Sequence, residues 1–240
     1  MKEKQDMKKR NIIRGFLVLV MVVMTGFFIN LEITKADEKN TENYHLIPWD
    51  DGQSGTYWMD GYLYWIDMKK KKISRYSDEE MTKEEVLVEA DKGTCIGECG
   101  LLYDDIIYYV LIDNKTHAGN LYSYNLKSRE SNKLGAAREL QRLEVLVDGK
   151  IYGCGYTKTG NPEVFLYDLK GKKLKQICKN GYFGQIVGKY IAIQTISSSG
   201  KSGMTLYRKS DGQKIKTITS NCSYYEFIDN TFYYVEPIAE

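Results

Sequence analysis

A two-residue turn recurs along this chain at nearly constant spacing, and each copy opens onto an aromatic or apolar run. The second residue of each turn is Gly, Asp or Asn, which tolerate the positive φ that a tight hairpin turn requires. Successive turns are 44, 44, 39 and 42 residues apart. They are Asp60-Gly61, Asp104-Asp105, Asp148-Gly149, Val187-Gly188 and Asp229-Asn230. The recurrence predicts repeated hairpins of similar size.

Four strands are predicted in each repeat. An apolar run precedes each turn, an aromatic or apolar run follows it, and a third run places an apolar residue three before a Tyr, as Leu121 and Tyr124 do. A polar turn and a fourth run (EVLVE, NKLG, LKQIC or IKTIT) follow in the four full repeats. Four strands at a period of about 40–45 residues are typical of a β-propeller. We therefore predict an all-β propeller of four full four-stranded blades and a partial fifth, with repeats starting near residues 56, 100, 144, 184 and 223.

Two forms of this propeller fit the sequence. The segment ENYHLIPW, residues 42–49, is a candidate outer strand for the last blade, which would close the ring. An open or truncated propeller is the alternative, and its mark would be an uncovered edge strand in the last repeat.

One repeat resembles a known family. In DGYLYWIDMKKKKISRYS, residues 60–77, Tyr64, Trp65 and Asp67 match the Tyr-Trp-Thr-Asp motif of low-density-lipoprotein-receptor-type propellers, and Ile66 replaces the Thr. The corresponding stretches of the other repeats are YYVL, YGCG, IAIQ and YYVE, so the motif survives once. Roughly residues 44–240 are also similar to secreted Firmicute proteins of unknown function that carry a degenerate form of this propeller. That family usually has six blades, which are not all present here.

The first 36 residues form a separate segment. A basic stretch with six Lys and Arg is followed by the uncharged run GFLVLVMVVMTGFFI, residues 15–29, and then by small residues at Thr34 and Ala36. This order is typical of a secretory signal peptide, and an uncleaved membrane anchor helix is the alternative. Either one places the remainder outside the cytoplasmic membrane. We therefore expect a signal peptide or N-terminal anchor at 1–36, a linker at 37–43 and the propeller at 44–240.

Charge and cysteine content narrow the choice of partners. Residues 37–240 contain 27 Lys and Arg against 29 Asp and Glu, so no overall positive charge predicts nucleic-acid binding. Contact with the membrane is expected only through residues 15–29, if they are not removed. The five cysteines lack metal-binding spacing, since CIGEC has no second pair and no nearby His. We expect neither a metal nor a cofactor, and small buried cysteines in strands.

No catalytic motif is apparent. His45 and His117 are the only histidines, and there is no Gly-x-Ser-x-Gly elbow. Gly200-Lys201-Ser202 lacks the upstream Gly of a phosphate loop and precedes a predicted strand. We therefore expect an exported, non-enzymatic propeller that binds protein, peptide or glycan at the bacterial cell envelope. A propeller-based hydrolase or lyase with loop-borne residues is one alternative, and a truncated fragment without independent function is another.

The candidate binding residues lie in the connections of one face. In a propeller, the loops between second and third strands share a face with the connections from each fourth strand to the next blade. Variable loops on a rigid scaffold commonly carry binding sites. Among them we single out Tyr182, Phe183 and His117, because exposed aromatic residues anchor interfaces. The variable connections on this face are residues 89–99, 117–120, 135–142, 157–163, 178–184 and 197–203.

Overall fold

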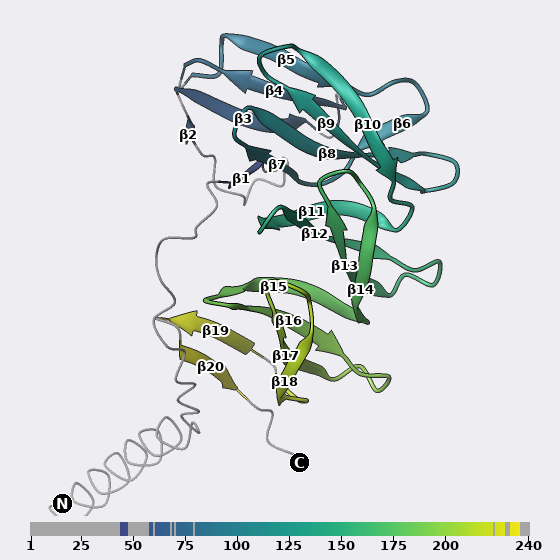
Figure 1. Ribbon diagram of the computed structural model, residues 1–240, viewed down its shortest axis with the longest axis vertical. Coiled ribbons are helices and arrows are strands. Elements are labelled where there is room, and N and C mark those ends of the chain that lie inside the picture. Colours follow the sequence, from purple (N-terminus) through teal and green to yellow (C-terminus); the bar gives the residue numbers. More distant parts are fainter. Residues whose placement is uncertain are drawn as a thin grey trace, which may run out of the picture. The chain divides into compact units, whose positions relative to one another are not determined.

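A computed structural model describes most of the chain after residue 43 (Figure 1). The described residues are 44–47, 58–59, 61–67, 69, 71–78, 80–222, 224–228 and 231–235. The expected signal or anchor segment and the linker lie outside them. The chain divides into two compact units, of which one is Lys35–Ser220 and the other includes the hairpin at the C-terminal end.

Four antiparallel sheets make up the first unit, and each has the strand order of a propeller blade. The strands of the first blade are β2 (Trp58–Met59), β3 (Tyr62–Asp67), β4 (Lys72–Tyr76) and β5 (Glu84–Glu89). Those of the second are β7 (Gly100–Tyr103), β8 (Ile106–Asp113), β9 (Gly119–Asn125) and β10 (Glu130–Ala136), joined by the short strands β1 (Tyr44–Ile47) and β6 (Thr94–Ile96).

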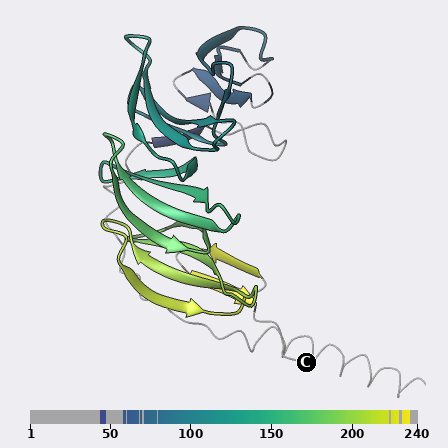
Figure 2. The ribbon, with the colours of Figure 1, turned by 90° about the vertical axis from the view of Figure 1, so that its right-hand side faces the viewer.

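The next two blades are regular and strongly twisted (Figure 2). The third contains β11 (Leu140–Val147), β12 (Lys150–Tyr156), β13 (Pro162–Asp168) and β14 (Lys173–Lys179). The fourth contains β15 (Gly181–Val187), β16 (Tyr190–Ile196), β17 (Ser202–Arg208) and β18 (Lys214–Thr219). In the second unit, β19 (Tyr224–Ile228) pairs with β20 (Thr231–Val235). The predicted all-β propeller of four full blades and a two-stranded fifth is confirmed.

The hydrophobic core lies between neighbouring blades of the first unit. One cluster joins the first and second blades through Tyr64, Ile66 and Ile107. A second joins the second and third blades, and a third joins the third and fourth. Because a middle strand packs on both of its faces, its sequence does not need to alternate between polar and apolar residues. This packing explains the near-continuous apolar runs that follow the recurring turns.

The fourth strand of each blade forms a sheet edge and carries a bulge, and three of these four strands also carry lysines. Register shifts interrupt the pairing of all four edge strands, for example between Leu166 and Tyr167 opposite β14. Lysines alternate along β14 (KLKQICK) and begin β18 (KIKTIT). Bulges and lysines at a sheet edge oppose pairing with the edge of another molecule.

The prediction that the segment 42–49 completes the last blade is wrong for its described residues. Strand β1 pairs instead with β7 of the second blade, where Leu46 lies opposite Leu101 and Ile47 opposite Gly100. Ile47 is fully buried in the cluster between the first and second blades. The free edge of β7 and this apolar site therefore hold β1 on the second blade. Closure of the ring stays a prediction.

No helix capable of crossing a membrane occurs in the part of the chain that the structure describes. The apolar run 15–29 lies outside that part. The expectation of buried cysteines in strands holds only in part: Cys95 lies in β6, Cys154 in β12 and Cys178 in β14, but Cys99 and Cys222 lie outside strands, and Cys95 and Cys99 are only half-buried. Cys154 and Cys178 are buried.

Candidate functional site

The three predicted binding residues occupy different settings. His117 lies in the exposed turn between β8 and β9, with a φ of 55°. Tyr182 and Phe183 were expected in a loop, but the structure places both inside β15. The reason is the short β14–β15 connection, in which Asn180 has a φ of 55° and the strand begins at the next residue. No hydrogen bond, ion pair or ring contact joins His117 to either aromatic residue within the described part of the chain.

The two aromatic residues of β15 pack against different partners in β12. The Phe183 ring lies 6.4 Å from the Tyr152 ring at a tilt of 48° and contributes to the core between the third and fourth blades. The Tyr182 ring lies 6.5 Å from the Tyr156 ring in an edge-on arrangement at 69°. Phe183 is therefore largely a packing residue, whereas Tyr182 belongs to a partly exposed tyrosine pair at the end of β12.

An ionic cluster surrounds Arg142 in β11, close to this tyrosine pair. The Arg142 Nε donates to Glu144 Oε1 at 2.5 Å, and its Nη1 lies 3.5 Å from Glu98 Oε2. Glu98 comes from the second blade, in the short segment between β6 and β7, so Arg142 ties two blades together. Burial raises the pKa of the Tyr156 hydroxyl, and the charges of Glu98 and Tyr182 raise it further. We name Glu98, Arg142, Glu144, Tyr156 and Tyr182 the Arg142 site.

Close backbone contacts position the two carboxylates. The Glu98 amide donates to the Gln141 carbonyl at 3.2 Å, and the Leu143 amide donates to the Cys99 carbonyl at 3.5 Å. A Cβ on Gly97 would lie 2.2 Å from the Gln141 carbonyl oxygen, so this approach requires glycine. On the other side, β11 carries register shifts between Leu140 and Arg142 and again before Val145, which make Glu144 a bulge residue.

Glycines in β12 make room for this bulged strand. A Cβ on Gly155 would lie 1.5 Å from the Glu139 carbonyl oxygen, and one on Gly153 would lie 2.7 Å from Leu140 Cδ2. The stretch YGCG of the third repeat therefore departs from the aromatic pattern of the first repeat for a structural reason. It lets the chain around Glu139 and β11 approach β12 closely.

Burial sets the ionisation of the cluster. The Glu144 side chain is 12% exposed, against 29% for both Arg142 and Glu98. Burial raises the pKa of the Glu144 carboxyl above its ordinary value, although the Arg142 guanidinium lowers it in part. Burial alone would lower the pKa of Arg142, but the carboxylates outweigh it and the net shift is upward. Burial also raises the pKa of the Cys154 thiol, which is hydrogen-bonded to Glu144 and stays protonated.

The arrangement offers three kinds of contact to a ligand. Glu98 and Glu144 supply acceptor oxygens, Arg142 supplies planar N–H donors, and Tyr156 and Tyr182 supply ring surface and hydroxyl groups. Burial also makes Glu144 a candidate proton donor. No group of three or more metal-ligating side chains occurs among the described residues.

Sequence reasoning found the face of this site but not its ionic residues. Glu98, Arg142 and Tyr182 all fall in connections marked as variable, at 89–99, 135–142 and 178–184. The missed signal was in LQRLEVLV, where Arg142 and Glu144 stand two positions apart in a strand that is otherwise apolar except for Gln141. Charged residues in such a strand require a partner, and here Glu98 of another blade provides it.

No protein family matches the sequence, and no curated protein matches it either. Solved structures do match. A prolyl endopeptidase has a TM-score of 0.51 at 12% identity, over 72% of this chain and 30% of that one. An oligogalacturonate lyase in complex with manganese has a TM-score of 0.51 at 11% identity, over 70% and 53%. A nidogen–laminin complex has a TM-score of 0.43 at 10% identity, over 66% and 59%.

These likenesses show the propeller fold alone, because all identities are very low. The chain spans less than two thirds of each of these proteins. The nidogen–laminin match is too weak to support the low-density-lipoprotein-receptor type in particular. The expectation of a non-enzymatic protein is contradicted, since propellers that match this one occur in a prolyl endopeptidase and a lyase. The absence of a recognisable motif was not sufficient ground for that expectation, because strands of separate blades can assemble a site.

Proposed function

We propose that the chain is an exported β-propeller whose Arg142 site binds a neutral glycan. The observation that carries this proposal is the combination, in one place, of a partly exposed tyrosine pair, two carboxylates and a guanidinium. Sugar rings present apolar C–H faces that lie against aromatic rings, and their hydroxyl groups both donate and accept hydrogen bonds. The Arg142 site supplies each complementary group.

The charge of the site favours a neutral glycan over an acidic one. Arg142 is the one cation among the five residues, and it is already paired with both carboxylates. A sugar carboxylate would meet Glu98 and Glu144 at close range, with like-charge repulsion. A neutral sugar can instead accept from the guanidinium and donate to the carboxylate oxygens.

Export supports a ligand outside the cell. The basic stretch, the apolar run 15–29 and the small residues at Thr34 and Ala36 support secretion or anchoring at the outer face of the cytoplasmic membrane. The partial Tyr-Trp-Thr-Asp motif at Tyr64, Trp65 and Asp67 supports kinship with low-density-lipoprotein-receptor-type propellers. Together these features support the proposal that the propeller binds its glycan at the cell envelope.

A second candidate function is cleavage of the bound glycan. It is favoured by the raised pKa of Glu144, which stands near the second carboxylate of Glu98. Glycoside cleavage requires two neighbouring carboxyl groups whose pKa values differ, and burial shifts the pKa of Glu144 in the direction that a proton donor needs. In this candidate, Glu144 donates a proton to the leaving oxygen, and Glu98 takes a proton from the water that attacks the sugar carbon.

Calorimetric titration of the full chain with chitohexaose and cellohexaose, and with polygalacturonate as an acidic comparison, tests the proposal. We expect binding of a neutral oligosaccharide, and a loss of about tenfold in affinity in Tyr182→Leu and in Glu98→Gln. Tyr190→Leu, at the far end of the fourth blade, is the matched control and should bind normally. Preferred binding of polygalacturonate, or equal binding by all variants, would contradict the proposal.

Release of reducing ends from the bound oligosaccharide distinguishes the second candidate. Cleavage that is lost in Glu144→Gln while binding persists would establish it. Binding of an intact oligosaccharide by the unmodified chain would leave recognition alone as the function.

A further inference from the structure

Positive charge is concentrated in the third and fourth blades. Residues 140–220 contain 14 Lys and Arg against five Asp and Glu, a net charge of +9, although the exported part as a whole is slightly acidic. Acidic residues elsewhere in the chain offset this local excess, so the net charge of the whole chain does not reveal it. A local excess of this size attracts anionic ligands to the surface that carries it.

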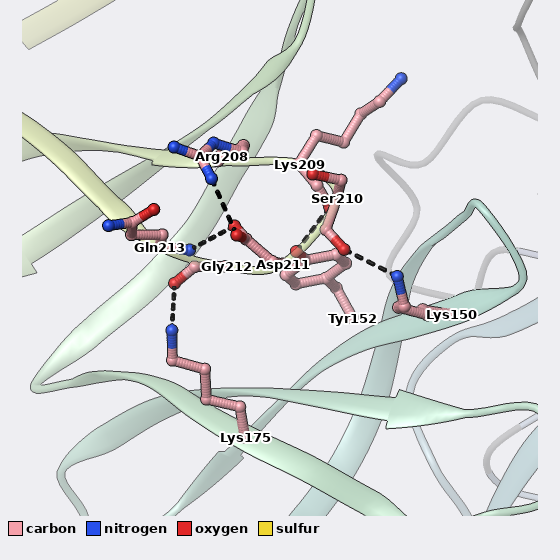
Figure 3. Close-up of polar contacts among 9 residues, drawn as sticks. All are labelled: Lys150, Tyr152, Lys175, Arg208, Lys209, Ser210, Asp211, Gly212 and Gln213. Carbon is pink, nitrogen blue, oxygen red and sulfur yellow. Dashed lines mark hydrogen bonds and ion pairs between the residues drawn. The ribbon is translucent and has the colours of Figure 1, made fainter.

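The turn between β17 and β18, which carries Lys209, is hydrogen-bonded to the third blade (Figure 3). Three of its carbonyl oxygens accept hydrogen bonds from that blade. Tyr152 Oη donates to the Lys209 carbonyl at 2.7 Å, Lys150 Nζ to the Ser210 carbonyl at 2.7 Å, and Lys175 Nζ to the Gly212 carbonyl at 3.0 Å. Because the Tyr152 side chain is fully buried, it fixes the Lys209 backbone firmly.

A hollow of about 420 Å³ lies beside this turn. Its lining includes Lys189, Tyr190, Lys209 and Ile215, with Arg208 and Asp148. These residues come from the short turns of the third and fourth blades, at the ends of the strands opposite to the Arg142 site. We name it the lysine hollow.

Two ammonium groups of the lysine hollow have no carboxylate partner among the described residues. The Lys209 amide donates to the Lys189 carbonyl at 2.9 Å, so the two lysines are neighbours in space. The Lys189 ammonium lies over the Tyr190 ring at 5.6 Å from its centre. Figure 3 shows the Lys209 side chain extending away from the hydrogen-bonded turn. Arg208, in contrast, is paired with Asp211 at 2.9 Å.

We infer that the lysine hollow binds an acidic peptide segment. Lys189 and Lys209 would pair with side-chain carboxylates of the peptide, and Asp148 at the rim limits how many anionic groups fit. Ile215, which lines the same hollow as Tyr190, is 42% exposed. An aliphatic side chain of a peptide gains by covering Ile215, whereas a polymer that carries only anionic groups does not. The mixture of cations and apolar surface therefore favours a peptide over a phosphate polymer.

Fluorescence anisotropy of the full chain tests this inference with a fluorescein-labelled peptide, Glu-Leu-Glu-Glu-Leu-Glu, its Gln counterpart, and polyphosphate. The acidic peptide should bind and the Gln peptide should not. Lys189→Gln combined with Lys209→Gln should weaken binding about tenfold, as expected for the loss of two exposed ion pairs. The matched control is Lys158→Gln with Lys201→Gln, which removes the same charge at the opposite strand ends and should change affinity less than about twofold.

A further variant separates a peptide from a simple polyanion. Ile215→Ser should weaken the acidic peptide and leave polyphosphate unaffected. Equal weakening by both lysine pairs would mean diffuse charge attraction and would overturn the site. Tight polyphosphate binding together with a normal peptide affinity in Ile215→Ser would overturn the assignment to a peptide. Circular dichroism of every variant checks that the fold is intact.

Discussion

The Arg142 site and the lysine hollow lie at opposite ends of the same strands, and they balance charge in opposite ways. At the Arg142 site, a cation from β11 is paired with carboxylates from two blades, and the group is largely buried. In the lysine hollow, Lys189 and Lys209 stand side by side without a carboxylate partner in the described part of the chain. The Arg142 site therefore joins two blades and also offers polar contacts to a ligand. The lysine hollow leaves two ammonium groups available to pair with the carboxylates of a binding partner.

The backbone packing that supports the two regions also differs. Bulges in β11 and glycines in β12 bring backbone atoms together around Arg142, so little can change there without disturbing the blade. The lysine hollow rests on hydrogen bonds from side chains to turn carbonyls. The Lys209 side chain extends away from that turn, and the Lys189 ammonium lies over the Tyr190 ring. Substitutions at the Arg142 site should therefore lower stability as well as ligand affinity, whereas substitutions of Lys189 and Lys209 should change mainly ligand affinity.

The largest effect is expected for Gly155→Ala. Its Cβ would lie 1.5 Å from the Glu139 carbonyl oxygen, so the backbone near the Arg142 site would have to shift, at about 3 kcal/mol or more of unfolding free energy. Gly160→Ala is the control, because its Cβ meets no atom within 4 Å and only its φ of 80° is unfavourable, at about 1 kcal/mol. Denaturant unfolding measures both variants. Equal losses would show that β11 and β12 are not closely packed.

Arg142→Met should rank next. It leaves the buried Glu144 carboxylate without its cation, which should lower the unfolding free energy by about 3 kcal/mol. Combining it with Glu144→Leu removes the stranded charge, and most of the loss should be recovered. A double variant no more stable than the single one would contradict the view that pairing, and not packing, dominates this region.

A smaller effect is expected for Tyr152→Phe beneath the lysine hollow. It removes the hydrogen bond to the Lys209 carbonyl in a buried setting, with a loss of about 1–2 kcal/mol. The acidic peptide should also bind more weakly, because the two lysines are less firmly held. Denaturant unfolding and anisotropy measure the two effects. Unchanged peptide affinity would mean that the turn does not organise the hollow.

The smallest effect concerns the ion pair between Lys72 and Glu84 in the first blade, in which the Glu84 side chain is 30% exposed and the Lys72 side chain 12%. Hydrogen bonds from Lys72 and Ser74 lower the pKa of Glu84 from 4.5 to about 2. The ionised form is favoured by folding, so its contribution is present above pH 4.5 and is lost as the pH falls toward 2. Glu84→Gln should therefore flatten the decline of unfolding free energy over this range. Glu80→Gln, at an exposed carboxylate of the same blade, should leave the decline unchanged.

Local pattern was enough to predict the blades, because turn chemistry and apolar runs repeat in each of them. The position of β1 was not predictable in this way, since its pairing with β7 depends on a free edge and an apolar site formed by other repeats. Tyr182 stays a predicted binding residue, but it was expected in a loop, and Asn180 permits a turn so short that Tyr182 falls in a strand. The ion pair between Glu98 and Arg142 forms only when two blades pack together. The sequence of a single repeat could therefore not predict it.

Hydrogen–deuterium exchange of the full chain, with and without chitohexaose, tests the central claim most directly. Binding at the Arg142 site predicts slower exchange in β11 and at the start of β15, with no change in the turn at residues 209–213. Protection confined to that turn, or no protection of β11 at a saturating concentration of a neutral oligosaccharide, would contradict the assignment of glycan binding to the Arg142 site.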